Sequence, residues 1–257
     1  MTASVGVDKH AFLHVEVRHV PALQSIVWLR RGWDDLRHIG LPSLAHGGLI
    51  AVLGAVLLTL CSSHVYLVSA AVTAYLLVGP VMTTGLCELS RRRAAREPLG
   101  FDESLEPLTR NRDGLVLFGV ILAIIALLWF LASALIVQSI MHTSSPTLSV
   151  ALWGGFTDAV TGPQVLAYIT SGAVLAGIVF SLSVVSVPLI IDRNASAIEA
   201  VWTSLRVTFS NVPAMLVWAV LIVGLSSLGF ATLLLGMVVV APVLGHATWH
   251  AYRDLVR

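Results

Sequence analysis

Two histidines near the end of the chain have a spacing that could bind a metal. His246 and His250 stand four residues apart, so a helix would place both imidazoles on one face, about one turn apart. His38 and His46 flank the start of the first long apolar run, and all four rings would gather if the first and last apolar runs were neighbours. Because imidazole is a ligand of zinc, copper and haem iron, one hypothesis is a haem or metal binding protein that uses His38, His46, His246 and His250.

The same residues also fit a structural role. Histidine and tryptophan at the end of a membrane span place an apolar body and a polar tip in the headgroup layer. The pair lacks the HExxH pattern, and Asp254 could orient His250 or form a salt bridge at the helix end. We therefore expect His246 and His250 to be anchoring and packing groups without a metal or cofactor. His250 should point to Asp254 or to a residue of the segment 30–46.

Other motifs that carry chemistry are missing from the sequence. There is no glycine-rich phosphate loop, no GxSxG and no cysteine pair at metal spacing, so we expect a protein without catalytic activity. No ionisable residue lies deep within an apolar run, which argues against an ion-coupled carrier. Helix breaks at Gly79, Pro80 and Pro188 nevertheless leave a small-molecule or lipid permease as an alternative.

The elements that would position these residues are membrane helices. Hydrophobic residues make up 57% of the 257 residues and charged residues 11%, against roughly 45–50% and about 25% in soluble domains. Six charge-free apolar runs are long enough to span a bilayer: 43–62, 65–86, 115–141, 165–191, 212–228 and 230–249. We expect an all-α polytopic membrane protein with a six-span domain at 43–257, preceded at 1–42 by a cytoplasmic tail and an amphipathic helix.

The distribution of charge predicts the orientation of these spans. All fifteen basic residues fall in four stretches, 1–42, 87–114, 192–211 and 250–257, which six spans would place on one side of the membrane. Basic residues accumulate on the cytoplasmic side. We therefore expect both termini in the cytoplasm of a bacterium, with the spans in its inner membrane.

Amphipathic segments are expected on the cytoplasmic face. Apolar residues recur at helical spacing in three connections, and such faces should lie against the inner leaflet or under the bundle. The apolar positions are Ala22, Ile26, Leu29, Trp33 and Leu36, then Phe101, Leu105 and Leu108, then Ile198, Trp202, Leu205 and Phe209. Asn194 or Ser196 could cap the last helix. Residues 65–140 and 165–228 then read as two copies of a weak internal repeat.

Both ends of the chain resemble a bacterial protein family. The stretches WLRRGWDDLRHIGLPSLAHG at 28–47 and PVLGHATWHAYRDLV at 242–256 are similar to a family of predicted six-helix integral membrane proteins classed as a domain of unknown function. Some of its members carry the label of putative cytochrome c oxidase subunit. The resemblance implies an accessory or scaffold protein whose partners are membrane lipids and a membrane complex such as a respiratory oxidase, and not nucleic acid.

Overall fold

The computed structural model describes residues 15–62, 71–72, 75, 79–141 and 162–257, and within them the chain is helical. The helices are Gln24–Ile39 (α1), Leu41–Cys61 (α2), Thr84–Ala95 (α4), Phe101–Ser104 (α5), Pro107–Arg110 (α6), Arg112–Met141 (α7), Gly162–Ser183 (α10), Ser186–Arg193 (α11), Ala197–Ser210 (α12), Val212–Ala231 (α13) and Met237–Leu255 (α14). The extended pairing in the described residues is one antiparallel bridge between Val17 and Val256. The all-α prediction is confirmed.

Four of these helical stretches are long and apolar enough to cross a membrane. They are Leu41–Cys61, Arg112–Ser133, Leu166–Arg193 and Val212–Ala231, and they correspond to the first, third, fourth and fifth runs predicted from the sequence. Much of the run 65–86 lies outside the described residues. The run 230–249 overlaps α14, which is not among the four. The count of six spans and the internal repeat stay predictions.

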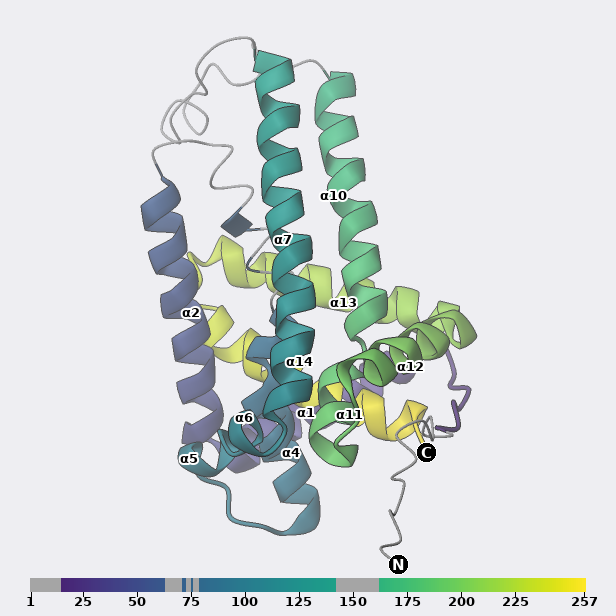
Figure 1. The fold of residues 1–257 in the computed structure, drawn as a ribbon. Helices are drawn as coiled ribbons and strands as arrows, with labels where there is room; N and C mark the ends of the chain where they lie inside the picture. Colours follow the sequence, from purple (N-terminus) through teal and green to yellow (C-terminus); the bar gives the residue numbers. More distant parts are fainter. Residues whose placement is uncertain (1–14, 63–70, 73–74, 76–78, 142–161) are drawn as a thin grey trace, which may run out of the picture.

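Figure 1 shows how these helices are arranged. Helices α2, α7 and α10 stand upright, whereas α13 and α14 run across the view. The shorter helices α4, α5, α6, α11 and α12 gather toward the lower end of the upright helices, which is also where the C-terminus lies. This end holds the residues that form the polar clusters described below.

Helix α14 is enclosed by the helices around it. Two glycines let its neighbours approach closely: a Cβ at Gly32 of α1 would lie 2.6 Å from the carbonyl oxygen of Val243, and one at Gly47 of α2 would lie 2.2 Å from that of Val238. Trp249 of α14 is 2% exposed, and its ring packs against that of Tyr252 with the centroids 5.4 Å apart.

The connection between α13 and α14 lies further along the chain than predicted. Helix α13 continues through Gly229 to Ala231, and the turn occupies 232–236, where Leu233 has a positive φ of 53°. The Thr232 hydroxyl accepts a hydrogen bond from the Gly236 amide at 2.8 Å. Gly229 has a packing role instead, since a Cβ there would lie 2.4 Å from the Met237 sulfur.

The proline break predicted at Pro188 is present in the fourth run. Pro188 has no amide hydrogen to continue the helix, and the chain divides there into α10 and α11. Ser204 of α12 stabilises the break, because its hydroxyl donates to the Ser181 carbonyl at 2.8 Å and accepts from the Val185 amide at 3.5 Å. The break therefore fixes where α12 packs.

The predicted amphipathic helices α1 and α12 form, but their apolar faces point outward. Ile26 and Trp33 of α1 are 52% and 45% exposed, and Trp202 and Phe209 of α12 are 64% and 73% exposed. A location under the bundle is therefore wrong for these side chains. Leu36, which belongs to the predicted apolar face of α1, is buried. The other buried residues of the two helices are small and polar ones together with Trp28, Ile39 and Val207.

The local signals at the helix ends have mixed outcomes. Of the two residues predicted to cap α12, Ser196 is the cap, and it forms a capping box with Glu199. The segment around Phe101, Leu105 and Leu108 forms two single-turn helices, α5 and α6, rather than one amphipathic helix. Pro107 begins the second of them, because proline suits the first turn of a helix.

Candidate functional site

A buried carboxylate, Asp35, joins three helices at the lower end of the molecule. It lies on α1 and is 3% exposed. Its oxygens accept hydrogen bonds from the Ser90 hydroxyl and the Arg93 guanidinium, both on α4, and form an ion pair with His250 Nε2 on α14 at 3.0 Å. Burial raises the pKa of Asp35, but the hydrogen bonds from His250 and Ser90 outweigh it and leave the pKa below its ordinary value. The site therefore holds Asp35 as a carboxylate.

The hydrogen bonds continue from Asp35 to a fully buried imidazole. Ser90 Oγ lies 2.7 Å from Nδ1 of His246, and the other ring nitrogen lies 2.9 Å from Ser43 Oγ on α2. A hydroxyl has one hydrogen, and Ser90 gives its hydrogen to Asp35. His246 Nδ1 must then donate to Ser90, while Nε2 accepts from Ser43. This assignment follows from the network and makes His246 a neutral link between α2, α4 and α14.

Three of the four histidines of the metal hypothesis, His46, His246 and His250, have protein partners. His46 Nε2 lies 2.7 Å from the Ser104 hydroxyl and its ring packs on Phe101 at 4.8 Å, whereas His38 is exposed. Among the described residues, no three His, Cys, Asp or Glu side chains are grouped so that they could hold a metal ion. His46 therefore bonds to a different residue from His246 and His250, whose contacts meet at Ser90 and Asp35.

Two alternative partners were predicted for His250, and one of them is confirmed. His250 contacts Asp35, which belongs to the predicted segment 30–46, and this prediction is confirmed. Asp254 was the other predicted partner, but it accepts instead from Gln24 at 2.8 Å, from the Trp28 indole at 2.9 Å and from Arg31 at 3.1 Å. Asp254 therefore fixes the first half of α1 on the end of α14.

A pocket lies beside this cluster. It has a volume of about 320 Å³ and is lined by Arg31, Asp34, Asp35, Ser90, Arg93, Ala94 and His250, which come from α1, α4 and α14. Asp34 is exposed, and the lining contains charges of both signs. A pocket of this kind suits a polar or charged group of a ligand or partner better than an apolar one.

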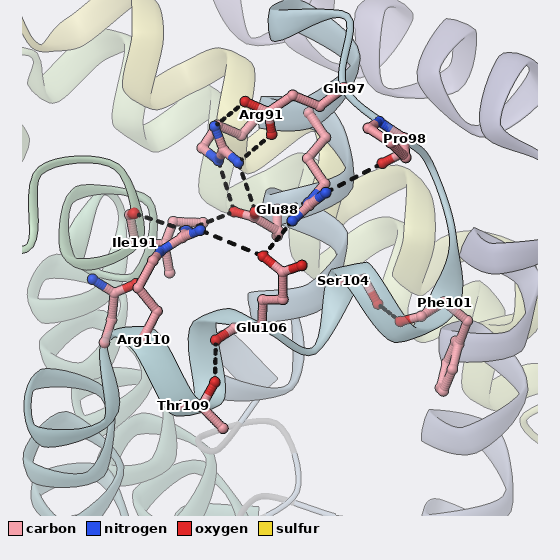
Figure 2. A network of polar contacts seen from close by, with 12 residues as sticks. Glu88, Arg91, Glu97, Pro98, Phe101, Ser104, Glu106, Thr109, Arg110 and Ile191 are labelled. Carbon is pink, nitrogen blue, oxygen red and sulfur yellow. Dashed lines mark hydrogen bonds and ion pairs between the residues drawn. The ribbon is translucent and has the colours of Figure 1, made fainter.

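A second buried carboxylate, Glu88, organises the arginines that follow it on α4. It is 0% exposed. Its oxygens accept from Arg91 at 2.8 Å, from Arg92 at 3.0 Å and from Arg110 of α6 at 3.3 Å. Figure 2 shows the guanidinium groups converging on Glu88 from different sides.

Two further carboxylates surround these arginines. Glu97 lies 2.7 Å from Arg91, and Glu106 lies 2.5 Å from Arg92 (Figure 2). The hydrogen bond to Glu88 raises the pKa of the Arg91 guanidinium, and Arg91 in turn lowers the pKa of Glu97. Arg110 also donates to the Ile191 carbonyl of α11 at 3.4 Å, so the network joins α4, α6 and α11.

Sequence reasoning did not identify Asp35, Ser90 or Glu88 as site residues. The run of arginines after Glu88 was attributed to membrane topology. A local signal was present, because Glu88 precedes Arg91 by three residues and Arg92 by four, the spacings at which side chains meet on a helix. No local signal connects Asp35 to His250, which lie 215 residues apart.

Comparison with known proteins supports a membrane protein of unknown function. Residues 67–192 match the model of a family described as predicted integral membrane protein (DUF2189). The match covers α4 and the Glu88 network, and it ends within α11. No curated protein and no solved structure matches the chain.

Proposed function

We propose that this integral membrane protein of unknown function is a non-catalytic accessory or assembly subunit of a membrane complex. Its inner-face helices would form a preassembled surface on which a partner docks. The complex that we propose is a respiratory oxidase of the cytochrome c oxidase type, on the basis of the resemblance of residues 28–47 and 242–256 described above.

The observation that carries this proposal is how the buried polar groups are used. Asp35, Ser90, His246 and Ser43 are hydrogen-bonded to one another across four helices, and Glu88 is surrounded by arginines. His246 and Glu88 are 0% exposed, so in this arrangement they are not open to a substrate. Polar groups that satisfy one another instead fix helices in one arrangement, which is what a scaffold requires.

The pocket beside Asp35 is the docking site that we propose. Arg31 and Arg93 line it together with the exposed Asp34, and the network beneath holds the pocket wall in place. A partner segment with charges of both signs would complement this lining, and electrostatic complementarity contributes specificity to such an interface.

The proposal includes a topology of six spans with both termini in the cytoplasm of a bacterial inner membrane. The four spans that length and composition indicate would be joined by the runs 65–86 and 230–249. The placement of all fifteen basic residues outside these six runs supports it. The two proposed repeat copies, 65–140 and 165–228, would each contain one proline-broken span.

Gentle purification tests the proposed function. The tagged protein is extracted in a mild detergent from the membranes in which it is naturally made, and the proteins that remain bound are identified by mass spectrometry. We expect oxidase subunits to remain bound to the parent protein. Asp34→Arg reverses a charge in the pocket without removing a hydrogen bond of the Asp35 cluster, and it should release them.

Asp102→Arg is the matched control, because Asp102 is also an exposed aspartate, on α5 and outside the pocket. It should retain the same partners as the parent. A parent protein that retains no other protein would refute the scaffold. Retention of a different complex would refute the oxidase, and retention by Asp34→Arg would refute the docking site.

A further inference from the structure

We propose that α1 and α12 together form an in-plane surface for anionic phospholipid, with their exposed apolar faces seated in the headgroup layer and three arginines directed at lipid phosphates. The four candidate spans are long and apolar enough to place the chain in a bilayer, and the amphipathic pattern predicts that these faces lie against a leaflet or under the bundle. The preference for anionic headgroups is the new element. The occupant is a lipid surface rather than a protein for the reasons that follow.

Helix α12 presents a large apolar surface that the protein leaves uncovered. Ile198, Trp202 and Phe209 are 67%, 64% and 73% exposed, and they repeat at intervals that place them on one face of the helix. Its opposite face is buried through small and polar residues such as Ala200 and Ser204. A soluble helix would have the reverse arrangement, with its apolar face inside.

Helix α1 has the same arrangement, although it lies in a different part of the sequence from α12. Leu23, Ile26 and Trp33 are 64%, 52% and 45% exposed, while the opposite face packs on α14 through Gly32. Tryptophan is enriched where a membrane meets water, because its ring is apolar and its N–H is polar. Each of the two outward faces therefore carries a tryptophan, Trp33 or Trp202, suited to that layer.

Basic residues lie among the apolar ones on both faces. Arg30 and Arg37 alternate with Ile26 and Trp33 along α1, and Arg206 falls between Trp202 and Phe209 on α12. All three arginines are exposed. Within the described part of the chain they form none of the ion pairs, in contrast to Arg31, Arg91, Arg92, Arg93 and Arg110.

This combination favours anionic lipid over a neutral apolar partner. A guanidinium on an apolar helix face can extend to the membrane surface while its aliphatic stem stays against apolar groups. Arg30, Arg37 and Arg206 form no ion pair within the described residues, and lipid phosphates supply the negative charge that balances them. Anionic headgroups attract such basic helices at the cytoplasmic leaflet.

Chain connections also require both helices to lie near a membrane surface. Helix α12 begins four residues after the candidate span that ends at Arg193 and ends two residues before the span that begins at Val212. Helix α1 ends at Ile39, two residues before the span that begins at Leu41. Neither connection is long enough to move its helix far from the bilayer, since an extended residue spans at most about 3.6 Å.

Quenching by brominated lipids tests the proposal. The full-length protein is reconstituted into nanodiscs of mixed phosphatidylcholine and phosphatidylglycerol in which either one or the other lipid carries bromine on its acyl chains. The fluorescence of Trp202 is the difference between the parent and Trp202→Phe, and the fluorescence of Trp33 is the difference between the parent and Trp33→Phe. We expect both to be quenched, and at equal mole fraction brominated phosphatidylglycerol should quench more strongly than brominated phosphatidylcholine.

Arginine variants then test the headgroup preference. Arg206→Gln should remove the excess quenching of Trp202 by phosphatidylglycerol, whereas Arg96→Gln, which removes an exposed charge at the end of α4, should preserve it. Equal quenching by the two lipids in the parent would overturn the anionic preference. Trp202 that is not quenched by either brominated lipid would overturn its placement in the headgroup layer. Quenching by aqueous acrylamide would then mean that Trp202 faces water, and the absence of quenching by lipid and by acrylamide would mean that a protein or a second copy covers it.

Discussion

The fully buried Glu88 gives the sharpest test of how helices α4, α6 and α11 are held together. Replacing it by glutamine removes the negative charge on which three arginines converge and changes the side-chain volume little. Arg92, whose side chain is 7% exposed, would keep one carboxylate partner, Glu106. The variant therefore leaves positive charge without full compensation inside the protein.

The expected loss of stability follows from these contacts. Breaking a buried ion pair by removing one partner costs about 3–5 kcal/mol. Arg91 and Arg92 both retain a second carboxylate, so we expect the lower end, about 3 kcal/mol. At roughly 2–4 °C per kcal/mol for a chain of this size, the midpoint of thermal unfolding should fall by about 6–12 °C.

A native thiol provides the measurement. Cys87 is buried next to Glu88, and its sulfur lies 3.4 Å from the Gly245 carbonyl oxygen, so a thiol-reactive dye should label it on unfolding. The half-buried Cys61 is replaced by serine to leave one reporter. Heating the detergent-solubilised protein with the dye then gives the unfolding midpoint directly.

The control is Glu106→Gln, which removes a carboxylate from the same network at a position 51% exposed. Surface ion pairs contribute about 0–1 kcal/mol, so its midpoint should fall by at most about 4 °C. Equal shifts for the two variants would refute the reasoning, because burial of Glu88 would then contribute nothing to the strength of its pairs.

Three other predictions concern packing, pH and topology. Gly47→Ala should lower the unfolding midpoint well below that of Gly48→Ala in the same thiol assay, because a Cβ at Gly47 would meet an α14 carbonyl oxygen whereas one at Gly48 meets nothing within 4 Å. The pKa of Asp35 is lowered in the folded protein. Its stabilising contribution is therefore present above its unfolded pKa of about 3.9 and is lost as the pH falls through the folded pKa. On acidification, the midpoint of thermal unfolding should fall less steeply in Asp35→Asn than in the parent. A cysteine replacing Ser145 should react with an impermeant thiol reagent added from the periplasm, and one replacing Ala95 should not.

The apolar helices could be predicted from the sequence, because a charge-free run of sufficient length has few other stable forms in a bilayer. Four of the six predicted runs correspond to stretches long and apolar enough to cross a membrane. The capping box at Ser196 and the break at Pro188 followed from local chemistry in the same way. Each of these features is determined by residues close together in the chain.

The packing faces of α1 and α12 could not be predicted by hydrophobic periodicity. In a soluble protein the apolar face of a helix is the buried one, but lipid removes that driving force, and helices then pack through small and polar residues. In α1, Ser25, Gly32 and Asp35 are buried beside Trp28, Leu36 and Ile39, while Trp33 is exposed. Periodicity thus located the helices correctly and left open which face meets the protein.

The candidate site was still harder to predict, because its contacts join distant parts of the sequence. The histidines were recognised, but their partners were not: Ser43 and Ser90 are ordinary residues in the sequence, and they become significant once α2 and α4 meet α14. A hydroxyl carries no pattern that identifies a hydrogen-bond partner 156 residues away.

The proposed topology would account for the side on which the arginines lie but not for the direction in which they point. Arg93 and Arg92 turn inward to Asp35 and Glu106, whereas Arg30 and Arg206 remain exposed on apolar helix faces. Cytoplasmic location alone would permit either arrangement for every one of them. The inward arginines find a carboxylate supplied by another helix, and this choice of partner fixes how α1, α4 and α6 meet. The outward arginines have no such partner in the described residues, so their charge is available to a membrane surface. Basic residues of one chain can thus both hold these helices together and hold them against lipid.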